Sequence, residues 1–290
     1  MERNFFGAWF DESERGNILA LGGFFAPITE VDSLVSGWRD MKVSLNLDPW
    51  AEVKWKLSED HPTRKQLEAT DHTTRELSEK ALEIITNQAT ITSLVTVMIE
   101  SRREDTKNMI KRVSKILPSV RDFYCEALGY LLQRLAEEAE EDYWTSCIIV
   151  CDNPGLGKKK FRMGKLWREP TAHYKKYKNC YENGPGVGPG KKLSEKSLYA
   201  LRFYPSLVVA DATFDDMLQI ADIIVGCTAD WVSHIAKDKE DTWLQERFIQ
   251  LMGILRNKYG SPGFWGDGLV LWPRNELWYK VRRAVENLIQ

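Results

Sequence analysis

The sequence predicts an α/β protein in which a mixed β-sheet is flanked by helices, and three observations support this class. Short runs rich in β-branched or aromatic residues, such as Ala89–Ile99 and Ser146–Cys151, have the composition of buried strands. These runs alternate along the chain with longer segments of helical periodicity. Finally, Phe5–Asp11 and Ile18–Ala26 flank a turn-like Glu-Arg-Gly-Asn sequence, which predicts an antiparallel hairpin at the start of the sheet.

Length and composition limit the possible classes of protein. A chain of 290 residues that is 43% hydrophobic and contains eleven Trp can fill a sizeable core, and we expect residues 1–290 to form a single domain. The five Cys include no C-x-x-C pair, which disfavours a zinc cage or a disulfide framework. The N-terminus has no signal-peptide pattern, and no apolar run reaches transmembrane length. We therefore expect a cytoplasmic protein with no membrane partner; the sequence does not indicate its oligomeric state.

The predicted hairpin carries the first candidate site residue. Asp11 is expected at the end of the first strand, where a rigid backbone can hold a carboxylate in place. Strand alternation puts Glu12 on the opposite side from Asp11. The alternative for Asp11 is an ordinary turn residue that caps the strand.

The segment after the hairpin is expected to contain one short helix and one extended stretch. Thr29–Leu45 has a helical pattern, with Thr29 or Asp32 as the possible cap. In the following Glu52–Lys56, charged and apolar residues alternate, so Glu52, Lys54 and Lys56 share one side of an extended chain. This pattern is typical of a solvated edge strand, but it also suits a Glu metal ligand beside a Lys that meets a phosphate.

Acids recur where predicted strands end. A long helix is expected over Thr63–Asn87, and two helices broken near Pro118 over Asp105–Asp142. Between and after these helices, the strands Ala89–Ile99, Ser146–Cys151 and Tyr204–Ala210 are followed by Glu100, Asp152 and Asp211, respectively. Functional residues of such sheets lie at one edge of the strands. Each further acid at a strand end therefore makes it less credible that none of these acids belongs to a functional site.

The segment Phe214–His234 is a predicted helix that is apolar almost all round. Asp215, Gln219, Asp222 and Gly226 follow one another at steps of four, three and four, which puts them on one face. A buried carboxylate there needs a cation, a metal or solvent. The alternative is that this stripe, continued by Asp230, is the wet face of an amphipathic helix. The chain is expected to close with the helix Trp243–Tyr259, the strand Leu269–Trp272 and the helix Asn275–Ile289.

A basic, Gly- and Pro-rich stretch over residues 155–197 is predicted to be a long loop insertion. Its part Lys158–Lys192 carries a net charge of +9 on a chain whose total is -2. Basic residues interleave with Tyr and Trp there, as expected where phosphates meet cations and bases meet rings. The alternative is a mobile loop without a ligand. The candidate nucleic-acid-binding residues are Lys158, Lys159, Lys160, Arg162, Lys165, Lys175 and Lys176.

Three motifs carry a resemblance to a known family. The sequence F-D-E-S at Phe10–Ser13, E-V-K at Glu52–Lys54 and M-L-Q-I-A-D-I-I-V-G at Met217–Gly226 resemble the domain of unknown function 3800 family. The resemblance implies an RNase H-like fold and a cluster of acids that binds divalent metal. This chain has Glu14 where a glycine is usual after D-E-S, and the resemblance does not account for the basic insertion.

By analogy with that fold, Asp11 and Asp222 should meet, joined by Glu52 and by an acid from a strand end. Asp152 is the choice for that fourth position, and Glu100 is the competing candidate. Such acids suit a two-ion Mg²⁺ or Mn²⁺ site that hydrolyses phosphodiester bonds of DNA or RNA, with Lys54 on the substrate phosphate. The alternative function is a catalytically inactive nucleic-acid-binding or regulatory protein on the same fold.

Overall fold

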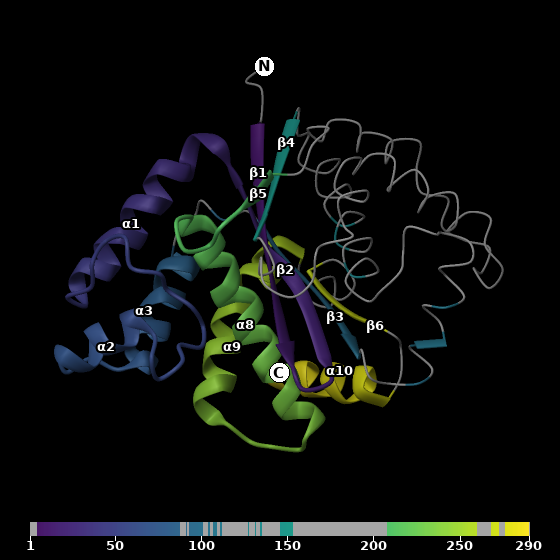
Figure 1. Cartoon of the computed structure of the whole chain (residues 1–290). Coiled ribbons are helices and arrows are strands. Elements are labelled where there is room, and N and C mark those ends of the chain that lie inside the picture. Colours follow the sequence, from purple (N-terminus) through teal and green to yellow (C-terminus); the bar gives the residue numbers. More distant parts are fainter. Residues whose placement is uncertain are drawn as a thin grey trace.

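The protein is a mixed α/β structure built on a six-stranded sheet with the order β5-β4-β1-β2-β3-β6 (Figure 1). The computed structural model describes residues 5–87, 91, 93–100, 146–152, 208–259, 268–272 and 276–289, together with the isolated positions 104, 107, 108, 111, 127, 131 and 134. The strands are β1 (Phe5–Arg15), β2 (Ile18–Pro27), β3 (Ser93–Glu100), β4 (Ser146–Asp152), β5 (Val208–Ala210) and β6 (Leu269–Trp272).

The hairpin at the start of the sheet forms as predicted, but its first strand is longer than expected. β1 and β2 pair antiparallel around Gly16, whose φ of 62° suits a residue without a side chain. The strand continues to Arg15, so Asp11 lies in mid-strand opposite Gly22, and its prediction as a strand-end residue was wrong. The charged residues Glu12, Glu14 and Arg15 were expected to lie beyond the strand. Charged side chains can nevertheless extend a strand when they have partners.

The remaining strands pair in two directions. β3 is antiparallel to β2, whereas β4 is parallel to β1 and β5 is parallel to β4. β6 adds to the other edge, parallel to β3. Since β4 lies beside β1, the end of β4, which carries Asp152, is a neighbour of the middle of β1, which carries Asp11.

The long helix α8 (Asp216–Ala236) packs against β1 and β2 on one face of the sheet (Figure 1). Outside it lie the 3₁₀ turn η1 (Ile28–Glu30) and the helices α1 (Val31–Ser44), α2 (Pro62–Ala69), α3 (Thr74–Asn87) and α9 (Thr242–Tyr259). The closing helix α10 (Glu276–Ile289) contacts α8. Since α8 lies between the sheet and the outer helices, all but four of its residues are buried.

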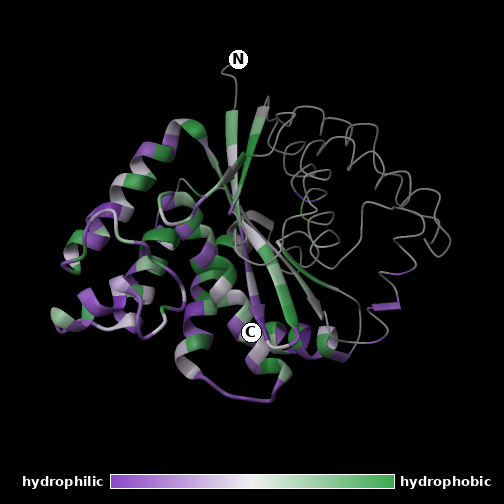
Figure 2. Ribbon diagram, in the orientation of Figure 1, coloured by the Kyte–Doolittle hydropathy of each residue, from purple (hydrophilic) through white to green (hydrophobic). Residues whose placement is uncertain are grey.

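Both faces of the central hairpin are buried. On the α8 side, Trp9 stacks on Phe24 with ring centroids 5.4 Å apart. On the other side, Phe10 meets Phe25 edge to face, and both rings are fully buried. Figure 2 shows the consequence: the strands are mostly hydrophobic, while the outer helices carry many hydrophilic residues.

Several predicted helices and strands differ in detail from the structure. The predicted helix over residues 63–87 is two helices, because the chain turns at 70–73 and Asp71 has a φ of 59°. Neither Thr29 nor Asp32 caps α1; its N-cap is Glu30, without a side-chain cap. The segment at residues 52–56 joins no sheet, although its alternation is real, since Val53 and Trp55 are buried. The basic insertion and nearly all of residues 105–142 lie outside the described residues.

Within the described part of the chain, no helix combines the length and the apolar character that crossing a membrane requires.

Candidate active site

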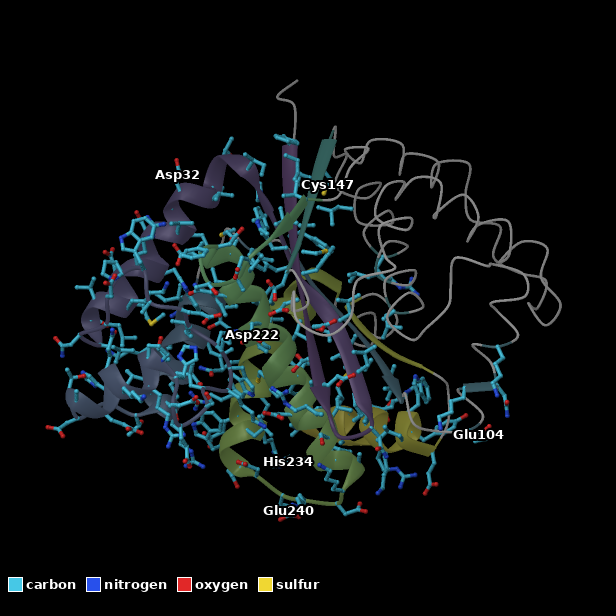
Figure 3. The ribbon with its side chains drawn as sticks, in the orientation of Figure 1. Asp32, Glu104, Cys147, Asp222, His234 and Glu240 are labelled. Atoms are coloured by element: carbon cyan, nitrogen blue, oxygen red, sulfur yellow. The ribbon has the colours of Figure 1, made fainter. Side chains whose placement is uncertain are left out.

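Three of the predicted acids come together from β1, β4 and α8. Asp11 lies on the face of β1 that carries Trp9, which is the face covered by α8. Asp152 follows Cys151, the residue that pairs with Phe10 in the neighbouring strand. Asp222 is in the middle of α8, at the centre of the view in Figure 3. The carboxyl group of Asp222 lies within interaction distance of that of Asp11.

Burial and mutual repulsion govern the ionisation of this cluster. Burial, then the negative charges of Asp222 and Asp152, raise the pKa of Asp11 well above its usual range. Burial also raises the pKa of Asp222, against the opposing effects of a backbone hydrogen bond from Trp55 and the charge of Lys54. Protonation of one of these two carboxyl groups would therefore reduce the repulsion between them.

Glu52 and Lys54 lie at the same site, but Glu52 already has several partners. Lys54 Nζ is 2.8 Å from Glu52 Oε1, and His61 Nε2 is 3.1 Å from Glu52 Oε2. The Thr213 hydroxyl lies 3.5 Å from Glu52 Oε1. Burial lowers the pKa of Lys54, but Glu52, followed by Asp222 and Asp152, outweighs burial and leaves that pKa raised. Lys54 therefore neutralises part of the charge of the whole acid cluster.

The orientation of His61 follows from its position at the start of α2. Its Nδ1 accepts a hydrogen bond from the backbone N–H of Thr63 at 3.3 Å. An accepting Nδ1 carries no proton, so the Nε2–H is the donor to Glu52. His61 thus caps α2 and holds Glu52 in place at the same time.

The polar stripe on α8 binds the segment at residues 52–56 and is not a wet helix face. Gln219 Oε1 accepts from the backbone N–H of Val53 at 3.1 Å, and Gln219 Nε2 donates to the carbonyl of Ala212 at 2.9 Å. One turn later, Asp222 Oδ2 accepts from the backbone N–H of Trp55 at 2.6 Å. These contacts fix the segment that carries Glu52 and Lys54 against the helix that carries Asp222.

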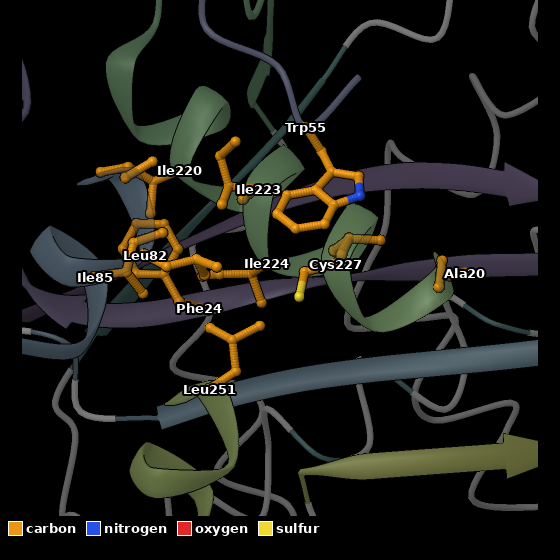
Figure 4. Close-up of a cluster of buried hydrophobic side chains, with 14 of the residues drawn as sticks. Ala20, Phe24, Trp55, Leu82, Ile85, Ile220, Ile223, Ile224, Cys227 and Leu251 are labelled. Atoms are coloured by element: carbon orange, nitrogen blue, oxygen red, sulfur yellow. The ribbon is translucent and has the colours of Figure 1, made fainter. Parts of the chain in front are cut away.

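Trp55 completes this docking. Its side chain lies over Gly226, where an added Cβ would come within 2.5 Å of the Trp55 Cβ. Figure 4 shows Trp55 over α8, near Ile223 and Cys227. The indole N–H of Trp55 donates to Asp230 Oδ2 at 2.7 Å. Gly226 is therefore required because the Trp55 side chain occupies the space of a side chain there.

Asp230 joins the docked segment to β1. It accepts from Lys56 Nζ at 2.8 Å and from Arg15 Nε at 2.6 Å, in addition to Trp55. Asp11 and Arg15 are four residues apart in a strand, about 13 Å, and Asp222 and Asp230 are eight residues apart in a helix, about 12 Å. These two distances match, so the approach of Asp222 to Asp11 and the contact of Asp230 with Arg15 can form together.

Two other acids of α8 have structural partners. Asp215 is the N-cap of the helix and accepts from the backbone N–H groups of Met217 and Leu218. Asp216 is paired with the fully buried Lys42 at 2.6 Å and with Arg39 at 2.8 Å. The stripe of four predicted from the sequence therefore divides: Asp215 caps the helix, whereas Gln219, Asp222 and Gly226 serve the site.

Strand register shows where the two candidates for the fourth acid of the site, Asp152 and Glu100, lie relative to Asp11. Asp152 follows Cys151, which pairs with Phe10, and its Oδ1 accepts from the backbone N–H of Ala212 at 3.0 Å. Glu100 pairs with Ile18, while the β3 residue beside Gly22, the partner of Asp11, is Thr96. The backbone of Glu100 is thus four residues, about 13 Å, along β3 from Thr96.

Sequence reasoning missed His61, Thr213 and the supporting role of Gln219. His61 was one of four histidines with no motif around it, although the H-P-T sequence at residues 61–63 suits a helix start. Thr213 lies two residues after Asp211, and its backbone N–H donates a hydrogen bond to the Asp211 carboxylate at 3.0 Å. This hydrogen bond lowers the pKa of Asp211. An Asp two residues before a Thr at a strand exit is the signal for such a turn.

The donor set suits a hard divalent cation, since carboxylate oxygens are the ligands that Mg²⁺ and Mn²⁺ prefer. Asp11, Asp152 and Asp222 repel one another, so a cation would lower their combined energy. Within the described residues, however, no three His, Cys, Asp or Glu side chains form a group that could hold a metal ion as they stand. A shared ion would therefore have to draw these carboxylates closer together, with all of them deprotonated.

Comparisons with models of protein families, with curated proteins and with solved structures each gave no match. The geometry of the acid cluster is therefore the ground for a functional assignment.

Proposed function

We propose that this chain is a divalent-metal-dependent nuclease of the domain of unknown function 3800 family. The observation that carries the proposal is the convergence of Asp11, Asp152 and Asp222, from β1, β4 and α8, on one partly buried place. Carboxylates brought together in this way raise the energy of the metal-free protein unless a proton or a cation lies between them. Such a cost is typical of a site that is kept for binding a charged ligand.

The fold gives a second line of support. An antiparallel β1–β2–β3 unit extended by β4 and β5, parallel to β1, agrees with the RNase H-like sheet that the resemblance implies. The Q-x-A-D-x-x-x-G motif also has a physical function, because Gln219, Asp222 and Gly226 bind the E-V-K segment. Two motifs that carry the resemblance are therefore in direct contact with each other.

Each residue has a distinct role in this proposal. Asp11, Asp152, Asp222 and Glu52 would hold Mg²⁺ or Mn²⁺, with His61 keeping Glu52 oriented. When bound, such ions would supply an activated water and neutralise charge on the leaving oxygen of a phosphodiester. The ammonium group of Lys54, whose side chain is 42% exposed, would move from Glu52 to an oxygen of the bound phosphate. The basic residues Lys158–Lys192 would hold the backbone of DNA or RNA.

The test is a cleavage assay with mixed single- and double-stranded DNA and RNA in Mg²⁺, Mn²⁺ or EDTA. Asp11→Asn and Asp222→Asn should abolish metal-dependent cleavage while the protein stays folded, since Asn is similar in shape. Asp32→Asn, at an exposed position of α1, is the matched control and should retain full activity. Cleavage that persists in EDTA, or in both site variants, would contradict the proposal.

A second candidate function is an inactive nucleic-acid-binding or regulatory protein on the same fold. The observation that favours it is that Glu52 is already bonded to Lys54 and His61, as in a structural ion-pair network. Such a protein should bind nucleic acid equally well with Asp222→Asn, and without metal. Because a nuclease should also bind nucleic acid without metal, the cleavage assay on the same variants, together with the binding measurements, separates the two functions.

A further inference from the structure

Two exposed aromatic side chains lie next to the candidate site. Among the described residues, Phe214 is 82% exposed and Trp50 is 66% exposed, more than any other large hydrophobic side chain. Single exposed apolar residues are common and need no explanation. These two are different because of where they lie: Trp50 is two residues before Glu52, and Phe214 directly follows Thr213, whose hydroxyl contacts Glu52.

The loops that carry the two rings are joined by two contacts. One is the contact of Thr213 with Glu52 at 3.5 Å. The other runs through Arg39, whose guanidinium carbon lies 4.0 Å from the centroid of the Trp50 ring and whose Nε donates to Asp216 Oδ2 at 2.8 Å. Asp216 is only two residues after Phe214. The loops that carry the two rings are therefore joined to each other and to Glu52, a residue of the candidate site.

The backbone under each ring is fixed by hydrogen bonds. The N–H of Trp50 donates to Asp48 Oδ1 at 2.8 Å, and the N–H of Phe214 donates to the carbonyl of Asp211 at 3.0 Å. Arg39 covers one face of the Trp50 indole and leaves most of the side chain open to solvent. Rings that are exposed on an ordered backbone can receive a flat ligand at little cost in conformational entropy.

The surroundings of the rings indicate the chemistry of that ligand. A protein partner would favour a contiguous apolar patch, whereas these rings stand among charged residues such as Arg39, Asp48 and Asp211. An exposed aromatic face beside the proposed site for a phosphodiester is typical of a surface on which nucleic-acid bases stack. Bases paired inside a duplex cannot present their faces in this way, but unpaired bases can.

We propose that Trp50 and Phe214 bind unpaired bases by stacking, so that the preferred substrate of the acid cluster is single-stranded nucleic acid. This inference rests on the proposed function for the phosphodiester substrate, and it adds the strandedness of that substrate and two residues that contact it. Each ring contributes to the affinity through a base and not through a phosphate. Removing a ring should therefore leave the electrostatic part of binding unchanged.

The test is fluorescence anisotropy on the full chain in EDTA, where no cleavage occurs. The probes are a short labelled single-stranded DNA or RNA of mixed sequence, an abasic oligonucleotide of the same length, and the corresponding duplex. The proteins are wild type, Trp50→Ala, Phe214→Ala and Phe214→Trp. Tyr279→Ala is the matched control, because Tyr279 is also exposed, at 62%, but lies on α10.

Wild type should bind the base-bearing single strand more tightly than the abasic oligonucleotide or the duplex. Phe214→Ala and Trp50→Ala should each weaken binding to the base-bearing strand about 5- to 150-fold, the range typical of one stacked base. Affinity for the abasic oligonucleotide should not change. Phe214→Trp should preserve binding, and Tyr279→Ala should have no effect.

Equal affinity of wild type for the base-bearing and abasic strands would overturn the inference. Losses in Phe214→Ala and Trp50→Ala that are equal on both probes, or no larger than in Tyr279→Ala, would also overturn it. These outcomes are separate from failure of the proposed nuclease function, which the cleavage assay measures. A chain that never cleaves but shows base-dependent binding through Phe214 supports stacking and contradicts catalysis.

Discussion

The backbone N–H of Trp55 donates a hydrogen bond to Asp222 Oδ2 at 2.6 Å, so a main-chain atom orients the carboxyl group that meets Asp11. No substitution of Trp55 other than proline can remove that donor directly. The position of the donor depends instead on how residues 52–56 lie on α8. The geometry of the acid cluster is therefore sensitive to residues that do not belong to it.

The first prediction concerns Gly226. A Cβ there would lie within 2.5 Å of Trp55, so Gly226→Ala should displace the docked segment and destabilise the protein by about 1–3 kcal/mol. It should also reduce cleavage, because the Trp55 N–H moves away from Asp222. Gly253→Ala, in α9, is the control: among the described residues outside its own stretch of helix, nothing lies within 4 Å of an added Cβ, so the change should be neutral or stabilise by up to about 1 kcal/mol. Chemical denaturation measures both, and equal effects would contradict the prediction.

The second prediction concerns the pH dependence of stability without metal. The pKa of Asp11 is raised in the folded state, so the folded protein binds more protons than the unfolded chain above the unfolded pKa of about 3.9. Stability should therefore fall as the pH rises through the raised pKa. Asp11→Asn removes this effect, so it should be more stable than wild type near pH 8, with the difference shrinking toward pH 4.

Bound metal should reverse the order of stability of wild type and Asp11→Asn. With saturating Mg²⁺ or Mn²⁺ near pH 8, wild type should gain more in Tm than Asp11→Asn, since only wild type keeps the full set of carboxylates. Thermal unfolding with and without metal measures the difference. A stability difference that does not vary with pH or with metal would assign Asp11 to a purely structural role.

The third prediction concerns Gln219, a buried residue of α8 whose side-chain amide is hydrogen-bonded to the backbone of Val53 and Ala212. Gln219→Leu leaves the buried N–H of Val53 and the carbonyl of Ala212 without this partner, at a cost of about 1–3 kcal/mol each. Denaturant titration should show this loss, and cleavage should fall because Glu52 and Thr213 adjoin the freed positions. Gln245→Leu, at an exposed position of α9, should change stability by less than about 0.5 kcal/mol.

The fourth prediction concerns the basic insertion. Replacing Lys158, Lys159 and Lys160 with Ala should weaken nucleic-acid binding and flatten the dependence of log affinity on log salt, by about 0.7 to 0.9 for each phosphate that is no longer neutralised. Metal-dependent stabilisation should not change. Anisotropy over a range of salt concentrations measures the slope. An unchanged slope would assign these lysines to another role, such as docking a protein.

Local patterns in the sequence were enough to predict much of the sheet and α8. The hairpin, the strand Ser146–Asp152 and the helix around Asp222 each follow from a periodicity within a few residues. The end of β1 did not, because Arg15 is kept in the strand by Asp230, 215 positions away. The turn after Ala69 likewise lacks a proline or glycine and depends on Asp71 adopting a left-handed conformation.

The candidate acids were predicted from their places in the sequence, but their individual roles were not. Asp215, Asp222 and Asp230 look alike on a helical face, yet one caps the helix, one meets Asp11 and one binds Arg15 and Lys56. What separates them is the partner that each meets from a distant segment. Periodicity predicts the direction of a side chain, but it does not predict which residue of a distant segment packs against that side chain.

The match between the distance from Asp11 to Arg15 along β1 and the distance from Asp222 to Asp230 along α8 also limits how such a chain can change in length. Inserting a single residue between Asp222 and Gly226 would turn the later part of α8 by about 100° relative to the earlier part. The hydrogen bonds from Arg15, Trp55 and Lys56 to Asp230 would then break, and the fit at Gly226 would be disrupted with them. Related chains should therefore differ in the length of their surface loops, while the number of residues from Gln219 to Asp230 stays the same.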